Sequence, residues 1–142
     1  MGFCAEPFKG TVFSGIGEGG FYVSIYSKGF RHTLGITPYP GTLNVRVDGS
    51  QVDRLKKCLN EVGGVRVDPP PLPDAKLAPV LVYPARIGHV DAFIVKPQIT
   101  VYKDDVVEFI SEVYIRGALK LQDGDKVEFE VLPWREERPR KL

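Results

Sequence analysis

The sequence has few of the residues that mark redox, metal-binding and nucleic-acid-binding proteins. Its 142 residues include two cysteines, two histidines, one methionine and one tryptophan, and the formal net charge is +1. A charge this close to zero gives no electrostatic argument for a nucleic-acid or membrane partner. The histidines and the cysteines, Cys4 and Cys58, do not have the spacing of a metal site. We expect two reduced thiols, with a disulfide between them as the alternative.

Long apolar runs and targeting signals are also missing. The longest apolar stretch, residues 77–83, is far shorter than the roughly 20 residues that span a bilayer. The N-terminus does not have the basic-then-apolar pattern of a signal peptide. No internal repeat is present, and the length suits one domain with its own core. We therefore expect a single-domain cytoplasmic protein over residues 1–142, with a core over about 8–132 and a charged tail over 133–142.

Glycine and proline are abundant, with 15 and 12 residues, and they divide the chain into short segments. Most of these segments are rich in β-branched and aromatic residues, which predicts strands. The predicted strands are residues 8–13, 21–26, 42–47, 79–87, 90–95, 106–110 and 126–131. Ser50 is a candidate N-cap of a helix through about Glu61, and residues 116–119 suit one helical turn. Many short strands and few helices favour a small closed or nearly closed barrel.

The segment from Ser14 to Gly20 is the first that suggests chemistry. It contains the pattern G-x-G-x-x-G, which is weak evidence by itself. A dinucleotide-binding fingerprint would open a helix, whereas residues 21–26 are predicted here as a strand, and the P-loop pattern is absent. A glycine turn between two strands can direct backbone N–H groups at phosphate oxygens. The alternative is a tight hairpin without a ligand.

The segment Pro40-Gly41-Thr42-Leu43-Asn44 is the second. Leu43, Val45 and Val47 alternate along the predicted strand, so Thr42 and Asn44 share its other face. A hydroxyl and a carboxamide on one face can reach a single Mg²⁺ ion, which usually takes one or two protein oxygens. An ordinary exposed strand face is the alternative. Phosphoryl transfer requires a phosphate-binding element and a metal site together, which favours the functional interpretation of both segments.

Together these segments resemble the archaeal CTP-dependent riboflavin kinase family. The resemblance covers residues 10–23, 35–47, 90–97 and 106–131, and order, spacing and residue type all agree. It implies a mostly β, single-domain, six-stranded cradle-loop barrel that transfers the γ-phosphate of CTP to the 5′-hydroxyl of riboflavin, giving FMN and CDP. The partners it implies are these two small molecules and Mg²⁺, with no nucleic acid and no membrane, in a monomeric protein.

The resemblance also implies site residues. Thr42 and Asn44 would hold Mg²⁺, and Thr100 and Glu108 would contact the flavin. The nucleotide would be bound by Gly15, Ile16, Gly17, Glu18, Gly19 and Gly20, together with Val113, Tyr114, Ile115 and Arg116. Glu108 is also the candidate catalytic residue, as a proton acceptor for the hydroxyl nucleophile. If strand pairing directs it inward, desolvation would raise its pKa; if it points outward, it is only the polar face of a strand.

Two other functions are compatible with the sequence. The rhythm Leu-x-x-Gly-Asp-x-Val near the end of the chain also occurs in swapped-hairpin DNA-binding barrels, although the basic residues here are scattered. A flavin carrier that binds FMN without turnover is the second. A DNA-binding protein would show affinity that falls steeply with salt, and a carrier would be unaffected by the loss of Thr42 and Asn44.

Overall fold

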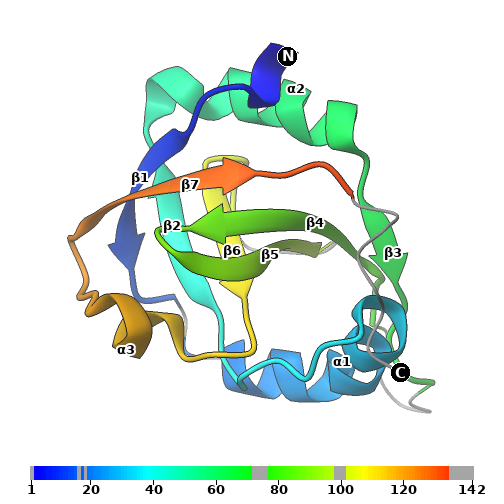
Figure 1. Ribbon diagram of the computed structural model, residues 1–142. Coiled ribbons are helices and arrows are strands. Elements are labelled where there is room, and N and C mark those ends of the chain that lie inside the picture. The colour runs from blue at the N-terminus through cyan, green and yellow to red at the C-terminus, as the bar shows by residue number, and fades with distance from the viewer. Residues whose placement is uncertain (1, 16, 18, 72–76, 98–101, 135–142) are drawn as a thin grey trace.

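The computed structural model describes residues 2–15, 17, 19–71, 77–97 and 102–134. Within these ranges the chain forms seven strands, three α-helices and two 3-10 helices (Figure 1). The strands are β1 (Phe8–Phe13), β2 (Leu43–Val47), β3 (Val65–Val67), β4 (Val80–Ile87), β5 (Val90–Pro97), β6 (Val106–Ile110) and β7 (Lys126–Val131). The helices are α1 (Gly19–Leu34), α2 (Val52–Val62) and α3 (Ile115–Leu119), with η1 (Gly2–Cys4) and η2 (Gly49–Gln51) as 3-10 turns.

Six of the described strands form a closed antiparallel barrel. The sheet order is β3-β4-β5-β6-β2-β1-β7, and β7 also pairs with β4, which closes the ring through pairs such as Ala85↔Val131. Strand β3 extends the sheet beyond the ring by pairing with β4. The predicted six-stranded barrel is confirmed, and β3 is an addition to it. The hairpin between β4 and β5 turns at Gly88, whose φ of 58° favours glycine.

Alternate residues of the strands face two separate hydrophobic clusters. On β5, Ile94 belongs to the cluster inside the barrel, whereas Phe93 and Val95 belong to a second cluster on the outer side. Helix α2 contributes Leu55 and Leu59 to the inner cluster. Helix α1 contributes to the outer one, and Figure 1 shows the two helices at opposite ends of the molecule. The side of the barrel that α1 covers is also the side on which the candidate site lies.

The prediction of a strand over residues 21–26 is wrong, because this segment is the first half of α1. Val23, Tyr26 and Phe30 are buried at helical spacing and pack on the outer face of the sheet. Burial of this face outweighs the strand propensity of the individual residues. The helix ends before Gly35, which has a φ of 72°. The N-cap prediction at Ser50 is also wrong, since Ser50 lies within η2 and α2 follows Gln51.

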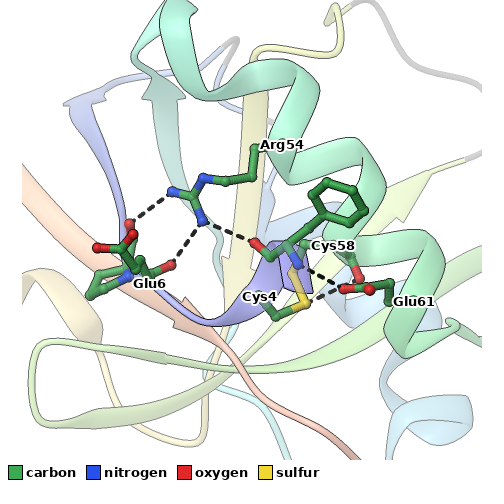
Figure 2. The surroundings of a disulfide bond; sticks show 7 residues. Cys4, Glu6, Arg54, Cys58 and Glu61 are labelled. Atoms are coloured by element: carbon green, nitrogen blue, oxygen red, sulfur yellow. Dashed lines mark hydrogen bonds between the residues drawn. A yellow bond between two sulfur atoms is a disulfide. The ribbon is translucent and has the colours of Figure 1, made fainter. Parts of the chain in front are cut away.

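The expectation of two reduced thiols is wrong as well. Cys4 and Cys58, which are 54 positions apart in sequence, form a disulfide that joins η1 to α2 (Figure 2). Hydrogen bonds strengthen the same attachment. Arg54 of α2 donates to the carbonyl oxygens of Phe3, Glu6 and Pro7 at 3.0 Å each, and its guanidinium lies 3.8 Å from the centre of the Phe8 ring. The segment before β1 is therefore fixed to the outside of α2.

Candidate active site

The glycine turn connects the end of β1 to the start of α1. Gly17 has a φ of 86°, a conformation that favours glycine, and the 16-residue helix begins at Gly19. The unpaired backbone N–H groups of a helix N-terminus attract anions, so the turn has the properties of a phosphate site. The turn does open a helix, contrary to the sequence-based argument against a dinucleotide fingerprint. The chain still differs from dinucleotide-binding folds, which have a mostly parallel sheet, because its β1 and β2 pair antiparallel within a barrel.

The turn packs directly against Thr42 and Asn44. A Cβ added at Gly19 would lie 2.7 Å from Thr42 Oγ1 and 3.0 Å from its backbone nitrogen. A Cβ added at Gly15 would collide with Asn44 Nδ2 and with the hydroxyl of Tyr102. These glycines therefore allow a close approach that side chains would prevent. The two segments singled out in the sequence form one site.

Thr42 and Asn44 present two oxygens to the same point. The Thr42 hydroxyl donates to Asn44 Oδ1 at 3.2 Å, and Asn44 is buried, with 8% of its surface exposed. Adjacent ligands of an octahedral Mg²⁺ ion at about 2.1 Å are separated by about 3 Å, so this pair fits such an ion. Within the described residues, no group of three or more His, Cys, Asp or Glu side chains could hold a metal. A site with two neutral oxygens requires the remaining ligands to come from water and phosphate.

Glu108 lies next to this pair on the barrel wall. It is the cross-strand partner of Asn44 on β2 and of Val95 on β5, so it is on the side of the sheet that α1 covers. Burial raises the pKa of Glu108 above its usual value, and the nearby Lys96 opposes part of that rise. The expected pKa shift is present, although Glu108 faces α1 and not the barrel interior.

Tyr22 of α1 is a residue of this region that the sequence did not reveal. Its hydroxyl oxygen is buried and has no hydrogen-bond partner among the described residues. Burial, followed by the neighbouring Tyr26 and Glu108, raises the pKa of Tyr22. A buried hydroxyl without a partner is costly, and such groups are often found where a ligand binds.

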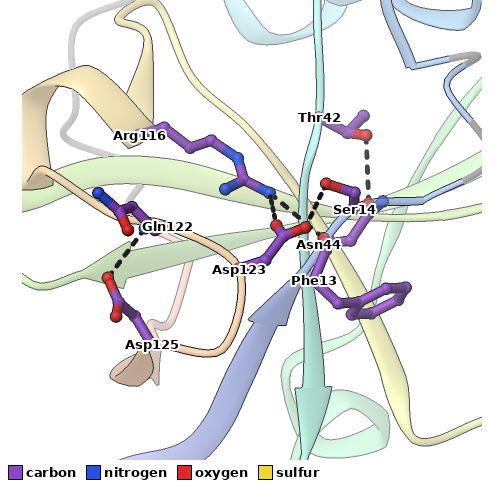
Figure 3. A network of polar contacts seen from close by, with 8 residues as sticks. All are labelled: Phe13, Ser14, Thr42, Asn44, Arg116, Gln122, Asp123 and Asp125. Carbon is purple, nitrogen blue, oxygen red and sulfur yellow. Dashed lines mark hydrogen bonds and ion pairs between the residues drawn. The ribbon is translucent and has the colours of Figure 1, made fainter.

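A polar network connects the glycine turn to α3 on the other side of the site (Figure 3). Asp123 accepts hydrogen bonds of 2.7 Å from Ser14 and from Arg116. A small cavity of about 100 Å³ lies beside it, and its walls include Thr42, Ser111 and Arg116. Tyr39 and Tyr114 also line this cavity and stack with their ring centres 4.8 Å apart. The cavity thus joins Thr42 to residues 113–116, the segment predicted for the nucleotide.

The remaining predicted residues have different positions. Val113 and Tyr114 are about half exposed, whereas Ile115 is 5% exposed and its side chain belongs to the inner cluster. Ile115 can therefore offer a ligand its backbone but not its side chain. Ile16, Glu18 and Thr100 lie outside the described residues, so their predicted roles stay predictions.

A larger cavity of about 660 Å³ lies between the C-terminal end of α1 and the β4–β5 hairpin. Its walls include Leu34, His89, Phe93 and Trp134, and it shares Ser111 and Val113 with the smaller cavity. Thr42, Asn44 and Glu108 do not belong to its described lining. Thr42 and Arg116 line the small cavity instead, and Asn44 lies against Gly15 of the glycine turn.

Fold and site together define a small antiparallel barrel in which a glycine turn at a helix N-terminus lies beside a pair of neutral side-chain oxygens. The family model CTP-dep_RFKase, described as a domain of unknown function, DUF120, matches residues 12–131. The chain belongs to this CTP-dependent riboflavin kinase family. None of the helices in the described ranges has both the length and the apolar character that crossing a membrane requires.

Individual relatives agree with the family model. The chain is 56% identical over 126 residues to a riboflavin kinase of Aeropyrum pernix, covering 88% of this chain and 95% of the relative. It is 41% identical to a riboflavin kinase of Archaeoglobus fulgidus and 40% identical to one of Thermoplasma acidophilum, covering 87% and 86% of this chain. It spans 54% and 56% of those two proteins, which are longer.

Proposed function

We propose that this protein is a riboflavin kinase that transfers the γ-phosphate of CTP to the 5′-hydroxyl of riboflavin, giving FMN and CDP. Membership of the family and the names of its relatives support the kinase activity and the acceptor. The structural observation that carries the proposal is the close packing of the glycine turn on Thr42, next to Asn44 and Glu108. CTP as the donor follows the family name. We also propose that the protein acts as a monomer in the cytoplasm.

The phosphate donor would be held between two segments. The backbone N–H groups of residues 15–20 would bind the phosphates, because this segment leads into α1, which begins at Gly19. Residues 113–116 would complete the nucleotide pocket, with the Arg116 guanidinium as its positive charge. Thr42 and Asn44 would hold Mg²⁺, which neutralises the charge of the transferring phosphoryl group. These parts bind and align the donor, which is most of what this reaction requires.

The acceptor would be held on the α1 side of the barrel by Thr100 and Glu108. Glu108 would accept the proton of the 5′-hydroxyl. The hydroxyl oxygen would bond to the γ-phosphorus, and the bond from that phosphorus to the oxygen bridging it to the β-phosphate would break. Burial raises the pKa of Glu108, which makes it a better proton acceptor than an exposed carboxylate. Its position opposite Asn44 would bring the hydroxyl close to the metal-bound phosphate.

The test is to incubate the protein with riboflavin, Mg²⁺ and one of CTP, ATP, GTP and UTP, and to separate riboflavin from FMN. We expect FMN with CTP. FMN with ATP but not with CTP would keep the kinase and contradict the donor. Absence of FMN with all four nucleotides would overturn the proposal, and binding of flavin without turnover would then identify a carrier. The variant with Thr42→Ala and Asn44→Ala should lose the metal-dependent activity.

A further inference from the structure

Asp123 lies in a turn that is fixed to the end of β1. The turn over residues 122–125 joins α3 to β7, and Gln122 N–H donates to Asp125 Oδ2 within it at 2.8 Å. Two backbone hydrogen bonds connect the turn to β1: Val12 N–H donates to Asp125 O at 2.9 Å, and Gly124 N–H donates to Val12 O at 2.8 Å. The position of Asp123 is therefore set by main-chain contacts, directly opposite the residues that follow Val12.

The Asp123 carboxylate binds both segments that we propose to hold the nucleotide. Its Oδ2 accepts from the hydroxyl of Ser14, the first residue of the glycine turn, at 2.7 Å. Its Oδ1 accepts from Arg116 Nη2 at 2.7 Å, and the same nitrogen lies 3.5 Å from the carbonyl oxygen of Phe13 (Figure 3). Each carboxylate oxygen thus holds a group from a different part of the chain, since Ser14 is 109 residues away and Arg116 only seven.

The negative charge of Asp123 could affect nucleotide binding in two opposite ways. Hydrogen bonds from Ser14 and Arg116 lower the pKa of Asp123, so the carboxylate is ionised at neutral pH. A negative charge next to a site for a polyphosphate repels the ligand and offsets part of the positive charge of Arg116. If Asp123 were only a neighbouring charge, its removal would strengthen nucleotide binding. If it fixes the binding groups, its removal would weaken nucleotide binding.

We propose that Asp123 is a positioning residue for the nucleotide, which holds the start of the glycine turn and the Arg116 guanidinium at a fixed separation. This proposal rests on the proposed function, because it takes residues 15–20 and 113–116 as the nucleotide site. Asp123 acts through Ser14 and Arg116. It is not a catalytic residue, and the flavin side of the site at Glu108 does not depend on it.

The test is calorimetric binding of CDP and of riboflavin, measured separately for the wild type and for Asp123→Ala. We expect the dissociation constant for CDP to rise by about ten-fold or more, equivalent to about 1.4 kcal/mol. The dissociation constant for riboflavin should stay within about two-fold. Unchanged or tighter CDP binding would overturn the proposal in favour of a neighbouring charge. Equal losses for both ligands would overturn it in favour of a general structural role.

Two further variants sharpen the result. Asp123→Asn keeps an oxygen that can accept from Arg116 and an NH₂ group that can donate to the Ser14 hydroxyl. It should restore most of the CDP affinity, and a loss as large as that of Asp123→Ala would contradict positioning. Asp53→Ala is the matched control, because it removes an exposed carboxylate paired with Lys57 on α2, away from the site. It should bind both ligands as the wild type does.

A measurement without ligand separates this proposal from the proposed function. In ¹⁵N relaxation, the amides of Gly15 and Gly17 should become more mobile in Asp123→Ala and keep wild-type values in Asp53→Ala. Unchanged relaxation in Asp123→Ala would overturn the positioning role, whether or not the wild type forms FMN. If the wild type forms no FMN with any nucleotide, the proposed function fails, and the relaxation result still decides whether Asp123 orders the turn.

Discussion

Replacing Gly19 by alanine should separate activity from stability in this protein. The new Cβ would lie 2.7 Å from Thr42 Oγ1, which is about 0.7 Å inside the 3.4 Å at which ordinary contact begins. Thr42 or the glycine turn would have to move by a comparable amount. A displacement of about 1 Å in a catalytic site can cost roughly 10²-fold in rate, so we expect kcat/KM to fall by about 10- to 100-fold. This corresponds to about 1.4–2.7 kcal/mol of transition-state stabilisation.

Stability should fall less than activity in the same variant, because the backbone at Gly19 offsets part of the cost of this clash. Gly19 is the first residue of α1 and does not have a positive φ, so its backbone suits alanine, which also has the higher helix propensity. The assay is FMN formation at several riboflavin and nucleotide concentrations, together with thermal unfolding. Gly49→Ala is the matched control, because its Cβ would meet no described atom within 4 Å. A stable Gly19→Ala variant with activity close to that of Gly49→Ala would refute the importance of this contact.

Three further predictions concern stability, pH and catalysis. Reducing the disulfide between Cys4 and Cys58, which are 54 residues apart, should lower the free energy of unfolding by about 4 kcal/mol in the chain-entropy model. Thermal unfolding with and without a reductant should show a Tm lower by about 10–15 °C, and equal Tm values would contradict it. Hydrogen bonds from Ser14 and Arg116 lower the pKa of Asp123 in the folded protein. The contribution of Asp123 to stability is therefore present above the unfolded pKa of about 3.9 and is lost as pH falls through the folded pKa. The Tm of Asp123→Asn should therefore change less than that of the wild type in this acid range, and parallel Tm curves would contradict it. Glu108→Gln should lower kcat by roughly 10²–10⁴-fold while riboflavin binding is kept, measured by FMN formation and by flavin titration; an unchanged kcat would limit Glu108 to binding.

The barrel was predictable from the sequence because its strands are short, alternating and separated by turn residues. Strands β1, β6 and β7 have the predicted bounds, and the β4–β5 hairpin turns where Gly88 predicts it. Helix α1 was missed because its first half is rich in strand-forming residues. The spacing of Val23, Tyr26 and Phe30 was the available signal, since buried residues at intervals of three and four predict a helix face.

The site was predictable in part. The prediction of a phosphate site at residues 14–20 and that of a metal site at residues 40–44 supported each other. The structure brings the two segments into contact at Gly19 and Thr42. The link from Ser14 to Asp123 and the disulfide of Cys4 carry no local signal. Their partners are far apart in the sequence, and only the closure of the barrel and the docking of α2 bring them together.

The pairing of β1 with β7 has a consequence for how the protein folds. Phe8 near the beginning of the described chain pairs with Phe129 near its end, and β7 also supplies the contact with β4 that closes the ring. Loop-closure entropy makes such distant pairings slow, so folding should take milliseconds to seconds and end with this step. During synthesis, Asp123 cannot reach Ser14 before the turn over residues 122–125 has left the ribosome, and the barrel cannot close before Val131 has. The protein should thus acquire its affinity for nucleotide late and in one step.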